Sequence, residues 1–364
     1  MYQAIHYDDH GPMTDPCRYL RRHDLVYRRP ALRPYDGVPV GTGDAGGLLY
    51  QTAYGLELTV NHADALDYAP DGAMQAWAWE AEERQTAPVS CGHLSIRSTL
   101  PIFDWVYLEA FEQRLILSTA SIEGRAKTPF AEASWKLYAP REPDVLVLEL
   151  EIEQTEEAAL EIQIDKWPSP SFFHHYEQIL DIHDKNLYCV RAEANRDALL
   201  VTQALRRCRT ALAVSCGGEP EQLNSHAVCC RFPKQKRHRL TLYLAARASA
   251  EASVRENTLA ALTAAKDAPS LWQTHCRYWQ DFWSRSFLHL QENDYLENLC
   301  YLHLYQMGCG NLGKNPLTFA GLWGWFRDAR NWGHFYHWNH QQNYWGLYAA
   351  GHGERCENLS LIHI

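Results

Sequence analysis

From about residue 36 to residue 246 the chain is built of short runs rich in branched and aromatic residues, separated by turn residues. Some runs alternate strictly between apolar and polar, as in LELEIE at 148–153 and LEIQID at 160–165. Such alternation is typical of strands with one face in a core and the other in water. The expected strands are 47–51, 56–60, 94–98, 115–118, 145–153, 159–165, 199–205, 211–214 and 239–244. So many strands in one stretch predict a large antiparallel sandwich.

After residue 256 the pattern becomes helical. Residues 256–266 are rich in alanine, with Leu259 and Leu262 three apart, and Pro269 predicts the end of this helix. Ser270 is expected to cap a second helix. The apolar stripe expected on that second helix consists of Trp272, Cys276, Trp279 and Trp283.

A third helix is expected to begin at Asp294 as its cap. The stripe expected on it is Tyr295, Leu299, Leu302 and Tyr305. The glycine-rich residues 308–324 are expected to form a loop. No strand pattern returns, so a β domain followed by helices is predicted.

Composition limits the classes of partner. The chain has 364 residues, of which 46% are hydrophobic, and a formal net charge of -10. An acidic surface disfavours nucleic acid and anionic membranes, so neither is an expected partner. No run resembles a membrane helix or an export signal, which favours the cytoplasm. The odd number of cysteines, 11, with no C-x-x-C spacing predicts mostly reduced, buried thiols, and Cys229 and Cys230 are expected to face opposite sides of a strand.

Residues 321–351 mix aromatic rings with amides and are the candidate functional segment. Five tryptophans lie there, and four amides fall within five positions, Asn339, Gln341, Gln342 and Asn343. Flat rings stack on the C–H faces of a sugar while amides bond its hydroxyls, so a carbohydrate site is predicted. The structural alternative is that such rings fill a core, and it is the favoured interpretation for Trp345, Leu347 and Tyr348.

Two other motifs are set aside on physical grounds. Residues 41–46, GTGDAG, match the dinucleotide-binding pattern, but that motif must open a helix and a strand pattern follows here. A glycine-rich turn between strands is expected instead. His334, His337 and His340 recur every third residue without a carboxylate at ligand spacing, so stacking or hydrogen-bonding histidines are expected. No metal and no cofactor are predicted.

Glycoside cleavage normally needs two carboxylates. Near the aromatic segment only Asp328, Glu354 and Glu357 are acidic. Asp328 lies beside Arg327 and Arg330 and is expected to form a salt bridge, whereas Glu354 and Glu357 are expected at a solvated helix end. No convincing acid and base pair is found in this chain, and no serine nucleophile motif occurs.

The segments nevertheless resemble a family. Residues 339–345, NHQQNYW, are similar to the N-T-E-M-N-Y-W segment of glycoside hydrolase family 95, the α-L-fucosidases and α-L-galactosidases. Residues 321–323, GLW, resemble its G-L-W segment, and residues 39–46, PVGTGDAG, resemble its P-L-G-N-G-x-L-G. Residues 58–68, LTVNHADALDY, resemble its Q-L-N-E-D-T-L-W. These segments occur in family order.

The resemblance implies a multidomain β-then-α protein of the six-hairpin glycosidase superfamily. An N-terminal β-super-sandwich is expected over 1–250, a helical linker over 251–292, and the first hairpins of an incomplete (α/α)6 barrel over 293–364. The general acid and base are expected beyond the C-terminus of this chain, so that the chain as given is inactive. The last six residues, LSLIHI, also lead us to expect an open reading frame that stops inside a domain.

The resemblance also implies roles for single residues. Asn339 and His337 are expected to position water or substrate, and His337 departs from the family asparagine. Gln341 replaces the family glutamate. The side chains expected to bind substrate are those of Trp323, Trp338, Gln341, Asn343 and Tyr344.

The expected partner is an oligosaccharide or glycoside, and the oligomeric state is not predicted. Inverting hydrolysis of α-L-fucosides or α-L-galactosides is the favoured hypothesis. A glycoside phosphorylase of similar architecture is ranked lower because residues 321–351 offer only Arg327 and Arg330 to bind phosphate. A non-catalytic carbohydrate-binding or scaffold protein is the rival from another class.

Overall fold

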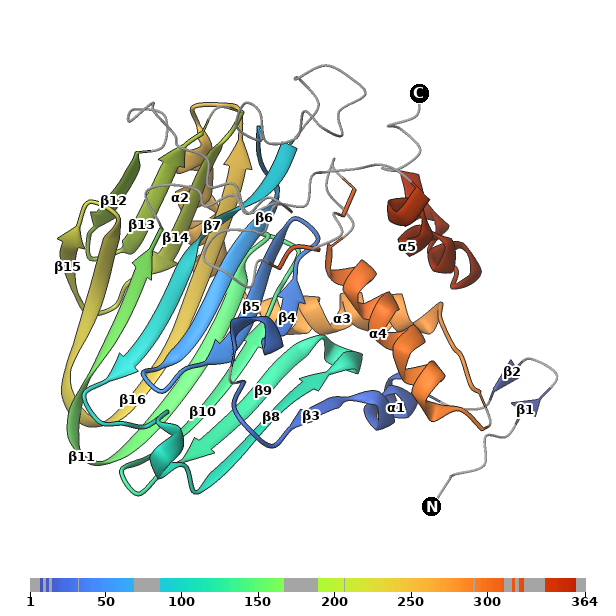
Figure 1. Ribbon diagram of the computed structural model, residues 1–364, viewed down its shortest axis with the longest axis horizontal. Coiled ribbons are helices and arrows are strands. Elements are labelled where there is room, and N and C mark those ends of the chain that lie inside the picture. Colours follow the sequence, from blue (N-terminus) through green and yellow to red (C-terminus); the bar gives the residue numbers. More distant parts are fainter. Residues whose placement is uncertain are drawn as a thin grey trace, which may run out of the picture.

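The computed structural model describes residues 7–8, 11–12, 15–31, 33–68, 86–166, 189–205, 207–290, 292–310, 316–317, 321–323 and 338–357. Within these ranges the dominant element is a 14-stranded antiparallel sheet (Figure 1). Its strands are β3 (Leu25–Tyr27), β4 (Val38–Gly41), β5 (Ala45–Gln51), β6 (Leu56–Tyr68), β7 (Thr86–Ser98), β8 (Ala110–Ile116), β9 (Ser121–Lys127), β10 (Ala131–Tyr138), β11 (Leu146–Asp165), β12 (Val190–Ala194), β13 (Ala198–Ala204), β14 (Arg209–Ser215), β15 (Glu219–Asn224) and β16 (Ala227–Ser249). A separate pair, β1 (Tyr7–Asp8) and β2 (Gly11–Pro12), precedes them.

Two long strands turn this sheet into two layers. β11 has 20 residues and β16 has 23, and they pair with each other through a bulge between Glu153 and Leu160. The first half of β11 pairs with β10, which leads on to β9, β8 and β3. Its second half pairs with β7, which leads on to β6, β5 and β4. Bulges bend strands, so one continuous sheet forms both layers of the expected sandwich.

The alternating pattern of β11 accounts for the core between the layers. Leu148, Leu150 and Ile152 are at most 2% exposed, while the glutamates between them point away. Each buried Leu or Ile contributes about 1.5–3 kcal/mol relative to the exposed state. The predicted antiparallel strands are confirmed except at 115–118, where the strand ends at Ile116 and Leu117–Thr119 form a 3-10 turn. The runs at 145–153 and 159–165 form one strand rather than two.

The helices lie against two parts of the sheet. α2 (Val254–Asp267) covers the outer face of β14 and β16 through a small apolar cluster. α3 (Leu271–Ser284), α4 (Asp294–Gly310) and α5 (Trp338–Ala349) gather beside the sheet, together with the short helix α1 (Pro16–Leu20) (Figure 1). Short 3-10 turns are η1 (Arg21–His23), η2 (Pro34–Asp36), η4 (Trp105–Tyr107), η5 (Leu117–Thr119) and η6 (Gly353–Cys356). The (α/α)6 barrel and the domain boundaries stay predictions.

Only part of the apolar stripe expected on α3 is buried. Trp279 and Trp283 are buried as expected, whereas Trp272 and Cys276 are half-buried. Ser270 directly precedes α3, but its side chain makes no capping hydrogen bond, so the predicted role of its hydroxyl is wrong.

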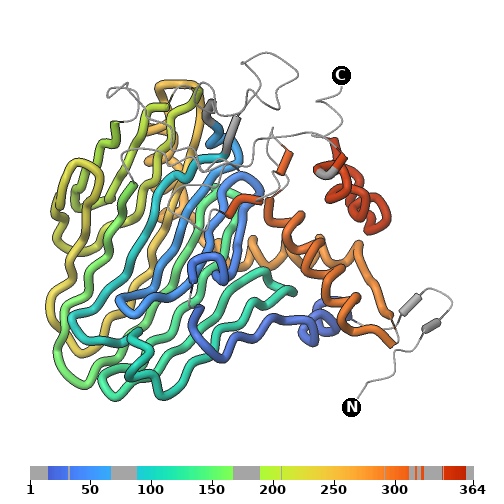
Figure 2. Tube along the Cα trace, in the orientation of Figure 1, coloured from blue at the N-terminus to red at the C-terminus, as the bar shows by residue number. Residues whose placement is uncertain are grey.

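The start and the inward face of α4 also differ from expectation. The Asn293 side chain accepts a hydrogen bond from the Leu296 N–H at 3.1 Å, so Asn293 rather than Asp294 caps the helix. Tyr295 and Leu299 are 72% and 43% exposed, so the predicted stripe is wrong at these two positions. The buried face carries Glu297, Tyr301, Leu304 and Tyr305. This face is buried because the N-terminal segment packs against it, and Figure 2 shows that segment as the blue trace beside α4.

No helix in the described part of the chain is long and apolar enough to span a membrane. All eleven cysteines are free thiols, as expected. Nine of them are buried or half-buried, and only Cys189 and Cys300 are exposed. Cys229 and Cys230 sit in β16 as neighbours along an extended strand and are both buried.

Candidate functional site

The glycine-rich residues 41–46 form the tight connection between β4 and β5, here named the β4–β5 turn. The Thr42 N–H donates to the Ala45 carbonyl at 2.8 Å, and Gly43 has a φ of +112° that favours glycine. The predicted turn between strands is therefore confirmed, and the dinucleotide-binding alternative is excluded because no helix follows.

The β4–β5 turn packs directly on the helical part of the chain. A Cβ at Gly41 would lie 2.5 Å from the backbone oxygen of Cys309. A Cβ at Gly46 would lie 2.4 Å from the Cβ of Leu322. Because real Cβ atoms do not approach so closely, only glycine permits this contact, which we name the junction.

Two hydrogen bonds from large side chains fasten the junction. The Tyr305 hydroxyl donates to the Pro39 carbonyl at 2.6 Å, and the Trp323 indole N–H donates to the Val40 carbonyl at 2.9 Å. The junction thus brings together residues 39–46 and residues 321–323, two of the segments on which the family resemblance depends.

A cluster of charged side chains surrounds the β4–β5 turn. Asp144 accepts a hydrogen bond from the Thr42 hydroxyl and forms an ion pair with Arg247 at 2.7 Å. Burial, together with repulsion from Asp144 and Asp64, raises the pKa of Asp44 to about 6. Perturbed carboxyl groups of this kind often mark functional sites, although structural networks produce them as well.

Two arginines meet one aromatic ring beside this cluster. The Arg141 guanidinium lies 4.3 Å from the centre of the Tyr278 ring, and Arg355 donates a hydrogen bond to the Tyr278 hydroxyl. Burial lowers the pKa of Arg141, and the nearby charge of Arg355 acts in the same direction. Arg141 follows β10, Tyr278 belongs to α3 and Arg355 to η6, so three distant segments converge here.

α5 is held to the other helices by polar contacts with its backbone. A ring nitrogen of His303 lies 2.9 Å from the carbonyl oxygen of Asn343. Near the end of α5, the Ser286 hydroxyl donates to the Ala350 carbonyl at 2.6 Å. The His352 ring stacks on Phe282 with 4.0 Å between centres. α5 is therefore oriented by α4 and by the end of α3.

The predicted substrate-binding residues occupy different environments. Trp323 is half-buried at the junction, and Gln341 and Asn343 are half-buried on α5. Trp338 is 58% exposed, whereas Tyr344 is 1% exposed and belongs to the core. The structure thus places Trp323 against the sandwich and the other four predicted residues on α5. The binding roles of all five stay predictions.

The predicted catalytic residues cannot be placed in the same way. His337 lies outside the described residues, and so do His334 and Asp328. Asn339 belongs to the first turn of α5, but its side chain lies outside the described part. Their expected roles stay predictions.

The remaining expectations for this segment have mixed outcomes. His340 is buried and stacks on Tyr344 with ring centres 5.5 Å apart, as expected for a stacking histidine, and burial lowers its pKa to about 4. Leu347 is buried as expected. Trp345 and Tyr348 are 56% and 62% exposed, so the expectation that they fill the core is wrong.

The acidic residues at the end of the segment behave as expected. Glu354 and Glu357 are exposed, and Glu354 forms a surface ion pair with Arg285 at 3.3 Å. Within the described ranges, no group of three or more His, Cys, Asp or Glu side chains is placed to bind a metal ion.

A groove of about 540 Å³ lies elsewhere, on the outer face of the sheet. It is open to solvent and is crossed by five strands, β8 to β11 and β16. Its lining includes Glu112, Arg114, Glu123, Arg125, Lys136, Glu149, Glu151 and Arg239. None of the predicted site residues lines it, and a face of alternating charges is typical of a solvated sheet surface.

A buried polar cluster on β6 and β7 has the residue types of a hydrolytic triad. A His93 ring nitrogen lies 2.7 Å from the Glu57 carboxylate, and Ser95 donates a hydrogen bond to the same carboxylate. Ser95 is bonded to the acid rather than to the histidine, and all three residues are at most 4% exposed. This arrangement satisfies buried polar groups and does not activate a nucleophile.

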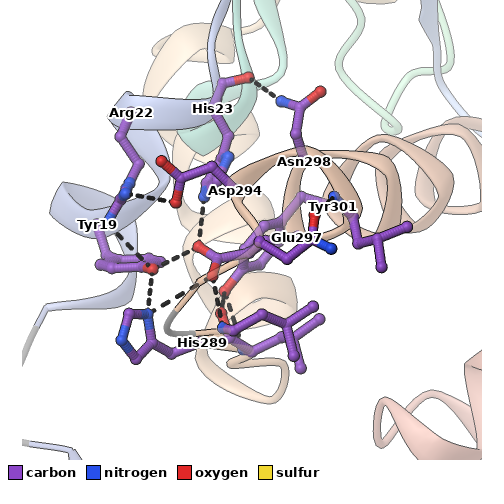
Figure 3. A network of polar contacts seen from close by, with 12 residues as sticks. Tyr19, Arg22, His23, His289, Asp294, Glu297, Asn298 and Tyr301 are labelled. Atoms are coloured by element: carbon purple, nitrogen blue, oxygen red, sulfur yellow. Dashed lines mark hydrogen bonds and ion pairs between the residues drawn. The ribbon is translucent and has the colours of Figure 1, made fainter.

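A second buried network centres on Glu297 of α4 and was not predicted from the sequence (Figure 3). The Glu297 carboxylate is 0% exposed and accepts hydrogen bonds from the Tyr19 hydroxyl and from the Leu290 N–H at 2.7 Å. A His23 ring nitrogen lies 2.6 Å from it, and a His289 ring nitrogen lies 3.5 Å from it. No local pattern marks Glu297, because Tyr19 precedes it by 278 positions.

This network joins the N-terminal segment to the helices. Burial would raise the pKa of Glu297, but the hydrogen bonds from Tyr19, Leu290 and His23 outweigh it and hold that pKa below its usual value. The carboxylate therefore stays charged and serves as the shared hydrogen-bond acceptor of the surrounding polar groups. Nothing in the described part opens it to a ligand, so its role is to hold α1 and η1 against α4.

Comparison with known proteins indicates the fold. No family model matches the chain, and no curated protein matches it. A solved structure from the human microbiome, described as a kojibiose phosphorylase, is similar with a TM-score of 0.54 and 13% identity, over 82% of this chain and 43% of that chain. The chain thus spans less than half the length of that protein.

Two further solved structures align with lower scores. A bacterial glucoamylase complexed with acarbose gives a TM-score of 0.45 and 8% identity, over 92% of this chain and 52% of that chain. A family GH92 α-mannosidase from Bacteroides thetaiotaomicron gives a TM-score of 0.35 and 7% identity, over 83% of this chain and 42% of that chain. Only the first of the three scores is high enough to indicate a shared fold. Membership of family 95 stays a prediction.

Proposed function

We propose that this chain is the sandwich and the first helices of a glycoside-processing enzyme, an inverting hydrolase that acts on α-L-fucosides or α-L-galactosides. In this proposal the sandwich occupies 1–250, a helical linker 251–292 and the start of an (α/α)6 barrel 293–364. The fold shared with the kojibiose phosphorylase supports a carbohydrate-active protein, and the sugar specificity depends on the family 95 resemblance alone.

The observation that carries the proposal is the junction. Gly46 contacts Leu322, and Trp323 donates to the Val40 carbonyl at 2.9 Å. These residues belong to two segments far apart in sequence that were matched independently to one family. Their contact supports a common origin for the pattern, because unrelated similarities have no reason to meet in space.

Exposed aromatic residues on the helices support the incomplete barrel. Trp345 and Tyr348 are both more than half exposed on α5, and Tyr295 is 72% exposed on α4. Rings on helices are normally covered by neighbouring helices. In the proposed enzyme further helices pack over these faces.

The proposed roles follow the resemblance. Asn339 positions the attacking water, His337 and Gln341 contact the sugar or the water, and Trp323 and Trp338 shape the pocket. The general acid and base lie beyond residue 364, and acid–base catalysis contributes typically about 10²–10⁴-fold to the rate. The 364-residue chain is therefore expected to bind sugar weakly and to hydrolyse no glycoside.

A glycoside phosphorylase is the second candidate. Arg141 and Arg355 both approach the Tyr278 ring. These two arginines are basic side chains outside residues 321–351. Arginine binds phosphate well through its planar group of N–H donors. Arg247 is a weaker contributor because it is paired with Asp144. A non-catalytic carbohydrate-binding protein is the third possibility and predicts binding without turnover.

The test compares the product of the full gene with the 364-residue chain on nitrophenyl α-L-fucoside, α-L-galactoside and α-D-glucoside, with and without inorganic phosphate. We expect nitrophenol release by the full product without phosphate and none by the chain. Release that requires phosphate, with a sugar phosphate as product, selects the phosphorylase. Measurable hydrolysis by the 364-residue chain contradicts an acid and base beyond residue 364. Sugar binding without turnover by the full product supports the binding protein.

The matched variants are Asn339→Asp and Asn343→Asp in the full product. Both replace an amide of α5 with a carboxylate, but only Asn339 is assigned to the attacking water. A loss of kcat in the first variant with a smaller change in the second supports the assignment, whereas equal losses contradict it.

A further inference from the structure

The thiols of Cys216 and Cys230 lie close enough to react with each other. Cys216 follows β14, and Cys230 belongs to β16, which pairs with β14. Their sulfur atoms are 2.7 Å apart. That is roughly 0.7 Å longer than the bond of a disulfide, so a small movement of the side chains joins them.

The backbone around the two thiols holds them together. The Gly218 N–H points at the Cys230 sulfur at 3.1 Å, and the Cys216 thiol lies 3.4 Å from the Gly218 carbonyl oxygen. A Cβ at residue 218 would lie 2.4 Å from the Arg231 carbonyl oxygen and 3.0 Å from the Cys230 sulfur. Glycine at this position lets the chain wrap closely around the thiol pair.

The two thiols differ in access. Cys216 is half-buried, whereas Cys230 is 1% exposed and belongs to the main core. A soluble reagent therefore reaches Cys216 first, and Cys230 is placed to displace the reagent. The neighbouring Cys229 faces the other side of β16 and is also buried, so it does not compete.

We propose that Cys216 and Cys230 are an oxidation site, at which an external disulfide converts the two thiols into an intramolecular disulfide. In the first step the Cys216 thiolate attacks a sulfur of the external disulfide and releases one small thiol. In the second step the Cys230 thiolate attacks Cys216 and releases the second small thiol. Two protein thiols are oxidised, one external disulfide is reduced to two thiols, and the two protons pass to the released thiolates.

The bond clamps the base of an exposed hairpin. β15 is an edge strand that pairs only with β16 among the described strands, and most of its residues are exposed. The proposed disulfide ties β16 at Cys230, opposite Pro220 of β15, to the end of β14. Oxidation therefore restrains opening of this edge. The proposal is independent of the proposed sugar chemistry.

The reaction is expected to be slow. Burial and the neighbouring Cys230 raise the pKa of Cys216 to about 12, so little thiolate is present at neutral pH. The same burial disfavours the thiolate that reduction has to release, so the disulfide resists reduction by small thiols while the protein stays folded.

The experiment treats the folded 364-residue chain with glutathione disulfide, blocks the remaining thiols with N-ethylmaleimide in denaturant, and maps the cysteines by peptide mass spectrometry. We expect a cross-linked peptide pair that contains Cys216 and Cys230 and the loss of two alkylated sites. A stable glutathione adduct on Cys216, alkylation of both thiols, or a cross-link of Cys216 to another cysteine overturns the proposal.

Variants provide the controls. Cys300→Ser removes an exposed cysteine away from the pair and is expected to leave the cross-link unchanged. Cys216→Ser is expected to leave Cys230 fully alkylated, and Cys230→Ser is expected to stop at the glutathione adduct of Cys216. Limited proteolysis of the wild type within residues 217–226 is expected to be slower after oxidation, and an unchanged rate contradicts the clamp.

Discussion

Removal of the Glu297 carboxylate should destabilise the contact between the N-terminal segment and α4. The carboxylate is 0% exposed, and in Glu297→Ala the Tyr19 hydroxyl, the Leu290 N–H and the His23 ring lose their shared acceptor. Breaking a buried charged network by removing one partner costs about 3–5 kcal/mol. Glu297→Gln keeps one acceptor oxygen, so it should cost about 1–3 kcal/mol.

The measurement is urea denaturation of the wild type and the variants at equal protein concentration. The matched control is Asp294→Asn, which removes a carboxylate from the first turn of the same helix. Asp294 pairs with Arg22 of the same N-terminal segment at 2.8 Å, but both side chains are partly exposed. A surface pair contributes about 0–1 kcal/mol, so the control should change little. Equal effects of Glu297→Ala and Asp294→Asn would refute the reasoning.

The pH dependence gives a second readout of the same carboxylate. The folded-state pKa of Glu297 is lowered, so its contribution is present above the unfolded pKa, about 4.3, and is lost as pH falls through the folded value. The stability of the wild type should therefore fall more steeply below pH ~4.3 than that of Glu297→Gln. Parallel curves would contradict an ionised Glu297.

Three further predictions concern the junction. Gly46→Ala should destabilise the chain by about 1–3 kcal/mol in urea denaturation, because its Cβ would lie 2.4 Å from the Leu322 Cβ. Asp44→Asn should stabilise the chain at pH 7 by about 1–2 kcal/mol after allowance for partial exposure, because the raised pKa of Asp44, about 6, means that folding disfavours its charged form. This gain in stability should vanish below pH ~4, and its persistence there would contradict the assignment. Trp323→Phe removes the hydrogen bond to the Val40 carbonyl and should cost about 0.5–1.5 kcal/mol, visible as a shift in the urea midpoint.

Local patterns predicted much of the fold. The alternation at 148–153 predicted a half-buried strand, and the structure places Leu148, Leu150 and Ile152 in the core. Residues 256–266 were expected to be helical and lie within α2. The strands β9 and β10 were missed, although β10 alternates regularly between buried and exposed residues. Polar residues in AEASWKLY weaken the apolar signal, and pairing with β11 compensates for them.

The helix faces show where local patterns fail. The apolar residues of α4 allow more than one stripe, and the expected one contained Tyr295 and Leu299, which are exposed. The face that is buried carries the charged Glu297, which no hydrophobicity pattern selects. Its burial is possible only because Tyr19 and His23 satisfy the carboxylate.

The sequence alone determined the antiparallel strands, the later helices and the turn at residues 41–46. These features follow from side-chain periodicity and glycine conformation, which act over a few neighbouring residues. Only the tertiary structure decided that Gly46 meets Leu322, that Glu297 meets Tyr19 and that Cys216 meets Cys230. Such contacts depend on how distant segments pack against each other, and that packing leaves no mark in the local order of residues.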